Sequence, residues 1–95
     1  MAAYLIADVE VTDPAAMGEY FKLAGESLAP FQWKSILCCG VVEVLEGDWK
    51  PKNLAMLEFE NMEQARQWYN SPAYSKPKGI RLRAASSNVI LVEGG

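Results

Sequence analysis

Residues 4–14 read YLIADVEVTDP, and this segment is the clearest guide to the architecture of the chain. Its first eight residues are rich in β-branched and apolar side chains, with polar ones at alternate positions, as is typical of a β-strand. One alternating set is wholly apolar (Leu5, Ala7, Val9, Val11), and the other is mixed (Tyr4, Ile6, Asp8, Glu10). This pattern predicts a sheet that helices cover on one face only. Asp13 and Pro14 then predict the N-cap and first residue of a helix.

The following segments predict the element order β-α-β-β-α-β. Helical spacing of apolar residues predicts a helix over about 14–29, with the stripe Met17, Tyr20, Phe21, Ala24 and Leu28. Strands are predicted over 34–46 and 53–60, a helix after the N-cap Asn61, a turn from Pro72, a break over 76–79, a short helix over 80–85 and a strand over 89–93. This order predicts an α+β, ferredoxin-like fold: a four-stranded antiparallel sheet with helices on one face, in a single domain of residues 1–95.

The bulk composition excludes several classes of function. The 95 residues carry a net charge of −3 and no basic run, which argues against a nucleic-acid partner. No apolar run is long enough to span a membrane, so a cytoplasmic protein is expected. Histidine is absent and the two cysteines do not form a Cys-x-x-Cys pair, so no metal site is predicted.

The second face of the predicted sheet is too apolar to remain in water. It would carry Tyr4, Ile6, Leu37, Val41, Leu54 and Met56 beside a few carboxylates. Contiguous apolar patches of this kind mark interfaces. The sequence therefore predicts a homodimer in which two copies meet through this face about a two-fold axis.

Four blocks of sequence resemble the DUF1330 family, and together they span nearly the whole chain. They are IADVEVTDP (6–14), VEVLEGDW (42–49), AxxWYxSPxY (65–74) and RLRAA (81–85). The resemblance implies membership of the dimeric α/β-barrel superfamily, in which two ferredoxin-like units pair sheet to sheet. Relatives in that superfamily include cofactor-free monooxygenases, polyketide cyclases and haem-degrading enzymes. It implies no established activity for DUF1330 itself, and no cofactor; haem degradation fits least, because no histidine can ligate the iron.

The chain departs from the family pattern around its second strand. Relatives usually carry Gly-Gly-Lys or Gly-Gly-Arg before this strand and Arg-Gly-Gly within it. The corresponding residues here are 32–34 (QWK) and 38–40 (CCG). We expect Trp33, in the loop before the strand, to fold over the mouth of a cavity, Cys38 to border that cavity and Cys39 to pack on the dimer face. A cavity without the family arginine would suit a neutral aromatic or aliphatic ligand.

The candidate ligand site lies between the sheet and the helices, where the superfamily places its ligands. The residues expected to contact a substrate are Tyr20, Trp33, Cys38, Trp68, Tyr74 and Arg81, with Tyr69 beside them. Aromatic walls with a few polar tips suit a small aromatic or polyketide-like molecule. The alternative is ordinary core packing of the aromatic residues at helical spacing, and an inert buried thiol rather than a nucleophile at Cys38.

Asp8 and Tyr69 are the candidate catalytic residues. Asp8 lies on the mixed face of its strand, with Glu58 expected nearby, and packed carboxylates raise each other's pKa enough for proton transfer. The alternative is a structural ion pair of Asp8 with Arg81 or Arg83 across the dimer. In both cases we expect Asp8 to be at least partly buried and bonded to an arginine or a hydroxyl.

The sequence is compatible with two functions. The first is a cofactor-independent enzyme that acts on a small apolar or aromatic, polyketide-like substrate. The second is a non-catalytic module that binds a small molecule or serves a structural role as a dimer. The missing histidine counts against the first, because histidine is the commonest general base.

Overall fold

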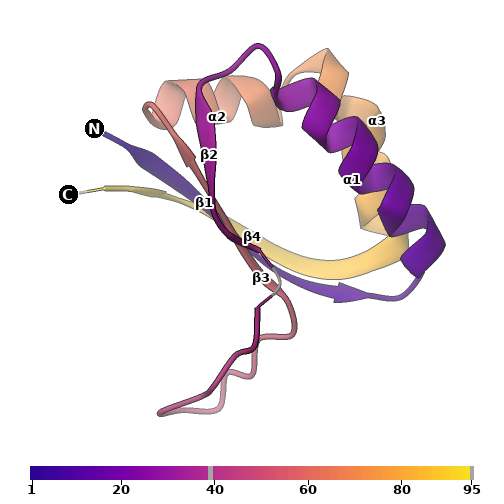
Figure 1. Ribbon diagram of the computed structural model, residues 1–95, viewed down its shortest axis with the longest axis vertical. Helices are drawn as coiled ribbons and strands as arrows, with labels where there is room; N and C mark the ends of the chain where they lie inside the picture. Colours follow the sequence, from indigo (N-terminus) through magenta and orange to yellow (C-terminus); the bar gives the residue numbers. More distant parts are fainter. Residues whose placement is uncertain (39, 95) are drawn as a thin grey trace.

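A four-stranded antiparallel sheet with helices on one face is found in residues 1–38 and 40–94, which the computed structural model describes. The strands are β1 (Ala3–Val11), β2 (Trp33–Cys38), β3 (Leu54–Phe59) and β4 (Ala85–Glu93), and the helices are α1 (Pro14–Leu28), α2 (Met62–Tyr69) and α3 (Pro72–Ala84). Figure 1 shows the helices together on one side of the sheet and the other side bare. The predicted α+β architecture is confirmed.

The strand order is β2-β3-β1-β4, so the segment quoted first from the sequence forms a central strand. β1 pairs with β4 along its whole length, from Ala3 opposite Glu93 to Val11 opposite Ala85. This long pairing explains why β4 begins at Ala85 and not at residue 89, as the sequence predicted. The alternation predicted for β1 is also present, because Ala3, Leu5 and Ala7 are buried against the helices.

The helix starts follow the local capping rules. The Asp13 carboxylate accepts a hydrogen bond from the Ala16 amide, and the Asn61 side chain accepts one from the Gln64 amide. These bonds satisfy donors that the first turn of a helix cannot satisfy itself. Both predicted N-caps are confirmed.

The core divides into two clusters at opposite ends of the helix layer. The larger contains Ala3, Leu5, Ala24, Leu28, Phe59, Ala65, Trp68 and Tyr74. The smaller contains Met17, Ala84 and Ala85. Tyr20 packs against both clusters. Phe21 was predicted to belong to the buried stripe of α1, but its side chain is 54% exposed.

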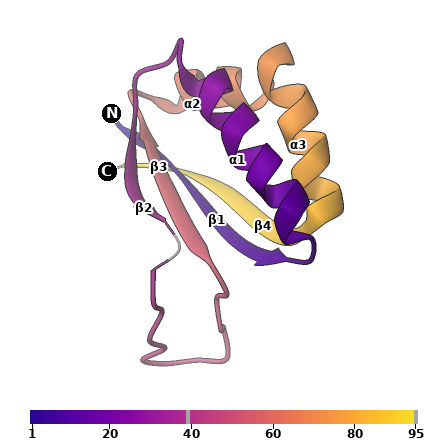
Figure 2. The same ribbon diagram turned by 45° about the vertical axis from the view of Figure 1, so that its right-hand side comes forward.

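β2 is shorter than predicted and begins earlier. Trp33 is its first residue, not a loop residue, and the strand ends at Cys38 instead of continuing to 46. Cys38 already pairs with Ala55, so in β3 only Leu54 would remain to pair with a longer β2. Residues 40–53 instead form a segment that extends beyond the sheet (Figure 2). Cys39 lies outside the described residues, so its predicted place on the dimer face stays a prediction.

A register shift between Ser35 and Leu37 interrupts the alternation of β2. Ser35 stands opposite Leu57 and Cys38 stands opposite Ala55. Both therefore share a face, although a regular strand would put residues three apart on opposite faces. Cys38 therefore turns toward the helix side, where it was predicted to border a cavity.

α3 is continuous where the sequence predicted a break. The helix passes through Pro77, a residue that removes one backbone donor and usually ends or kinks a helix. The Pro77 side chain is fully buried, and α3 packs along α1. Thr12 and Asp13 also donate backbone hydrogen bonds to the Ala84 carbonyl, which ties the end of α3 to the start of α1. Tertiary packing therefore outweighs the local signal.

Among the described residues, none of the helices combines the length and the hydropathy that crossing a membrane requires.

Replacement of Ser27 should reveal how strongly the core depends on one buried hydrogen bond. The Trp68 indole N–H donates to Ser27 Oγ at 2.9 Å, and both side chains are buried. In Ser27→Ala this donor loses its acceptor, so we expect the free energy of unfolding to fall by about 1–3 kcal/mol in urea denaturation. The exposed Ser75 on α3 is the matched control, and Ser75→Ala should stay within about 0.5 kcal/mol of the parent. Equal losses in the two variants would contradict this account.

Candidate functional site

A cavity of about 380 Å³ lies between the sheet and the helices. Its volume is at the lower end of the range for small-molecule sites, roughly 300–1,000 Å³. Its floor is formed by inward side chains of the strands, among them Leu5, Ala7, Ala55 and Leu57. All six residues of the edge strand β2 are exposed, so the helices leave this side of the sheet uncovered. Small floor residues and an uncovered edge strand together explain the space.

The roof of the cavity carries a pair of tyrosine hydroxyls. Tyr20 from α1 and Tyr74 from α3 place their hydroxyl oxygens 2.8 Å apart, and their rings meet edge to face at 6.2 Å. Both residues line the cavity. Burial, followed by the proximity of Tyr74, raises the pKa of Tyr20 well above its ordinary value, although the charge of Arg81 opposes this in part. Tyr20 is therefore a neutral hydrogen-bond donor throughout the physiological pH range.

Arg81 brings a positive charge to the same region. Its side chain is 4% exposed, lines the cavity and donates a hydrogen bond to the Ser87 hydroxyl of β4. The oxygens of Tyr74, Tyr20 and Tyr69 are its electrostatic neighbours. Within residues 1–38 and 40–94, no carboxylate forms an ion pair with this guanidinium. The cavity thus combines an apolar body with a cationic, hydroxyl-rich end.

Aromatic residues form one wall of the cavity. The Trp68 ring centre lies 4.1 Å from that of Tyr74 and 5.6 Å from that of Phe59. Tyr69 is next to Tyr74 at 5.7 Å, with the Lys78 ammonium 4.4 Å from the centre of its ring. Trp68 and Tyr74 are therefore both core residues and cavity walls. The two alternatives drawn from the sequence, a lining of the ligand site and ordinary core packing, thus apply to them together.

The structure brings together all six residues predicted to contact a substrate. Each of them lines the cavity, as does Tyr69; the set is Tyr20, Trp33, Cys38, Trp68, Tyr74 and Arg81. Cys38 is exposed rather than buried, so the predicted inert core thiol is wrong in its burial. The roles of these residues toward a ligand stay a prediction.

Asp8 lies elsewhere, on the opposite face of the sheet from Leu5 and Ala7. Its carboxylate accepts hydrogen bonds from the Trp49 indole at 3.1 Å and from the Lys52 backbone amide at 2.9 Å. The expected partial burial is present, but in the described part of the chain its partners are an indole and a backbone amide instead of the expected arginine or hydroxyl. Its neighbour on β3 is Leu54, so it is not close to Glu58, and the structure does not bring it near Tyr69.

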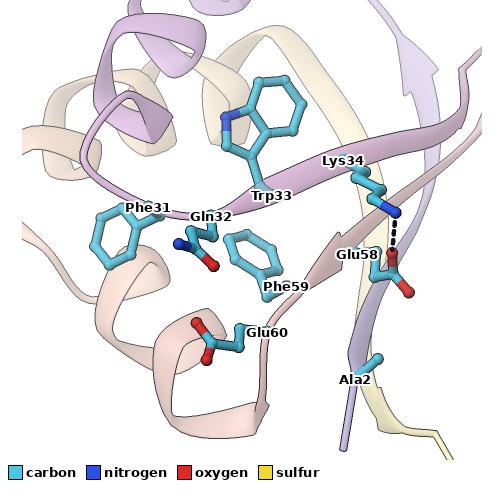
Figure 3. Close-up of a pocket in the computed structure, with 8 residues that line it drawn as sticks. All are labelled: Ala2, Phe31, Gln32, Trp33, Lys34, Glu58, Phe59 and Glu60. Carbon is cyan, nitrogen blue, oxygen red and sulfur yellow. Dashed lines mark ion pairs between the residues drawn. The ribbon is translucent and has the colours of Figure 1, made fainter.

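Glu58 belongs to a separate, open depression of about 520 Å³ at the other end of β3. Figure 3 shows Lys34 and Glu58 facing each other there, with a distance of 3.8 Å between Nζ and Oε2. Glu58 also accepts a hydrogen bond from the Tyr4 hydroxyl. The Trp33 indole turns away from this pair toward the helices (Figure 3), and Trp33 lines both spaces. Its side chain is thus a shared wall between them.

Several lining residues were not predicted from the sequence. Gly25 and Leu37 line the cavity, and so does Asn53, whose side chain donates to the Val9 carbonyl. Gly25 lies one helical turn after Phe21, so its position on the stripe of α1 was a usable signal. Leu37 was predicted on the bare face, where its pairing with Met56 also places it, yet it lines the cavity as well. Asn53 lies at the end of segment 40–53, for which the sequence offers no local signal.

Within the described residues, no group of three or more histidine, cysteine, aspartate or glutamate side chains is placed to hold a metal ion. Arg81, Tyr20 and Tyr74 are hydrogen-bonding groups and are unsuited to be a metal site.

Residues 2–95 match the family described as Domain of unknown function (DUF1330). The chain belongs to this family. No curated protein matches the chain.

Solved structures of other proteins have the same fold. RPA0582, a protein of unknown function from Rhodopseudomonas palustris, is similar with a TM-score of 0.79 and 15% identity, over 99% of this chain and 82% of that one. A dimeric ferredoxin-like protein of unknown function from Jannaschia sp. CCS1 has a TM-score of 0.67 and 13% identity, over 99% and 100%. SnoaB from Streptomyces nogalater, described as a cofactor-independent oxygenase, has a TM-score of 0.70 and 10% identity, over 99% and 93%. These similarities establish the ferredoxin-like fold of this DUF1330 chain.

The raised pKa of Tyr20 should appear in the pH dependence of stability. In the unfolded chain this tyrosine ionises near pH ~10, whereas the folded protein keeps it protonated. Its contribution to stability is therefore complete below about pH 10 and is lost as pH rises further, by up to about 1.4 kcal/mol per pH unit. Urea denaturation at about pH 9 and about pH 11 should show a smaller loss in Tyr20→Phe than in the parent. Identical losses would show that Tyr20 ionises normally.

Proposed function

We propose that this DUF1330 protein binds a small, mostly apolar or aromatic molecule in the cavity and acts on it without a cofactor. The observation that carries the proposal is the convergence of the Tyr20 and Tyr74 hydroxyls and the Arg81 guanidinium on one end of an otherwise apolar space. Small-molecule sites have this composition, with few polar groups that orient the ligand and apolar walls that hold it.

The lining limits the chemistry that the site can perform. Among residues 1–38 and 40–94, the lining contains no aspartate, glutamate, lysine or histidine, so it offers no carboxylate, amine or imidazole as a general base. What it offers is a set of hydrogen-bond donors and one cation, the groups that stabilise negative charge on a substrate oxygen. The proposed activity is therefore a reaction of a substrate acidic enough to give up its proton to water as it binds, so that Tyr20, Tyr74 and Arg81 hold the resulting enolate or phenolate oxygen. The description of SnoaB as a cofactor-independent oxygenase supports turnover without a cofactor on this fold.

The second candidate is binding without turnover. The absence of a general base among the lining residues favours it, because an inert ligand would need only the walls and the donors. Turnover of a bound ligand in the absence of added metal or cofactor separates the two candidates.

In either case the ligand-contacting residues are those that line the cavity, namely Tyr20, Trp33, Cys38, Trp68, Tyr69, Tyr74 and Arg81. Asp8 is not proposed as a catalytic residue, because its carboxylate is bonded to Trp49 and Lys52 on the far face of the sheet. Its role is to fix the end of segment 40–53 to β1.

Two glycines of α1 allow a controlled test of the cavity. A side chain at Gly25 or at Gly18 would meet open space, but only Gly25 lines the cavity. We expect Gly25→Leu to weaken binding of small aromatic molecules, found in a fluorescence screen, by about tenfold or more, since overfilling a site costs about 1–3 kcal/mol. Gly18→Leu should bind as the parent does while gaining the same helix propensity. Equal affinities of the two variants in calorimetry would place the ligand elsewhere.

We also propose that the protein is a homodimer that meets through the bare face of the sheet. Ile6 stands between Met56 and Ile90 on this face, and Ile90 is 55% exposed. Further exposed apolar side chains, Val41, Leu45 and Trp49, lie on segment 40–53. Contiguous apolar surface of this kind is unfavourable in water. The description of ferredoxin-like neighbours as dimeric supports the proposal.

A charge introduced on this face should separate the copies. We expect light scattering at micromolar concentration to show a dimer for the parent protein and a monomer for Ile90→Lys, because burial of an unpaired ammonium is costly. Leu82→Lys is the matched control, since Leu82 is 64% exposed and lies on α3, away from the sheet face. A parent monomer, or a dimer that survives Ile90→Lys, would contradict the proposal.

A further inference from the structure

Arg81 is a buried cation without a negative partner among the residues 1–38 and 40–94. Its side chain is 96% buried, since only 4% is exposed. A guanidinium carries five N–H donors, and here a hydrogen bond to Ser87 Oγ is present. Its other polar neighbours are the hydroxyl groups of Tyr74, Tyr20 and Tyr69. A buried charge in such surroundings has a large desolvation cost unless an opposite charge joins it.

The other cations of the described chain do not share this situation. Lys34 is paired with Glu58 at the surface, and Lys78 lies over the ring of Tyr69. Arg83, two residues further along α3, is exposed to solvent. The packing of α3 on α1 and β4 thus keeps Arg81 inside the protein, where it lines the cavity.

The groups around Arg81 match the hydrogen-bonding pattern of an oxyanion. The Tyr20 and Tyr74 hydroxyls share one hydrogen bond, so one hydroxyl hydrogen remains for a ligand oxygen. A guanidinium can donate two parallel hydrogen bonds to a carboxylate, and such charge-assisted bonds are about twice as strong as neutral ones. Most of the remaining lining is apolar, including Leu5, Leu57 and Trp68, and suits an apolar body.

We propose that the ligand of the cavity is a small carboxylate with an aromatic or branched apolar body, whose oxyanion binds Arg81 beside the Tyr20–Tyr74 pair. This inference rests on the proposed function and narrows its ligand from an apolar molecule to an apolar anion. It revises the expectation of a neutral ligand, which the sequence suggested because the arginine usual in the second strand is replaced here. Arg81 supplies the positive charge from the opposite side of the cavity, on α3 rather than on β2.

Matched acids and amides test this inference directly. Benzoate, phenylacetate and naphthoate are each compared with the corresponding carboxamide by calorimetry on the full-length protein. Each pair has nearly the same shape and differs in charge. We expect at least one acid to bind about tenfold or more tightly than its amide, because only the carboxylate brings a negative charge and a second acceptor oxygen to the guanidinium.

Variants of Arg81 assign this preference to the guanidinium. Arg81→Met should remove the preference for the acid and keep the affinity for the amide, whereas Arg83→Met should change neither. If circular dichroism shows that Arg81→Met does not fold, Arg81→Lys replaces it, and there the preference should fall severalfold because the two parallel bonds are lost. A structural role of Arg81 alone would lower both affinities together.

The outcomes distinguish this inference from the proposed function. If the parent binds amides as tightly as acids, or if the preference survives in both Arg81 variants, the inference is wrong while the small-molecule site stands. If no acid and no amide binds at millimolar concentration, the proposed function fails and the inference fails with it.

Discussion

The packing of Trp68 is the contact on which the rest of the structure depends. This one side chain touches Phe59 of β3 and Tyr74 of α3, and its indole N–H reaches Ser27 of α1. It therefore fixes the height of the helix layer at one end of the sheet, while Met17 and Ala84 do so at the other. Between the two contacts the strands present small side chains, Ala7 of β1 and Ala55 of β3, which stand opposite each other. The cavity lies over these small residues.

The polar end of the cavity owes its character to burial. In a region of low dielectric, a charge acts over a longer range than it would in water, and hydroxyl groups resist ionisation. The same exclusion of water that raises the pKa of Tyr20 also makes the Arg81 charge strong toward anything that enters. Fixed hydrogen-bond donors and a fixed cation are groups that stabilise a developing negative charge. Chemistry that needs a strong base within the lining does not fit it.

The two faces of the sheet serve different purposes. Alternate residues of β1 point to the cavity and to the bare face, so that Ala7 and Asp8 lie on opposite sides although they are adjacent in sequence. Asp8 holds the end of segment 40–53 through Trp49 and Lys52, and this segment carries exposed apolar side chains beyond the edge of the sheet. One face thus lines the cavity, and the other is bare and largely apolar.

The sequence by itself determined the element order, the helix starts at Asp13 and Asn61 and the inward face of β1, because each depends on residues close together in the chain. The family resemblance and the aromatic spacing also led to the residues that line the cavity. Only the tertiary structure decided the rest. The bulge in β2 follows from its register with β3, and the passage of α3 through Pro77 follows from packing on α1. The Tyr20–Tyr74 bond joins residues 54 positions apart, and the partners of Asp8 lie more than 40 positions away. Such contacts depend on how distant segments meet, and no local pattern encodes them.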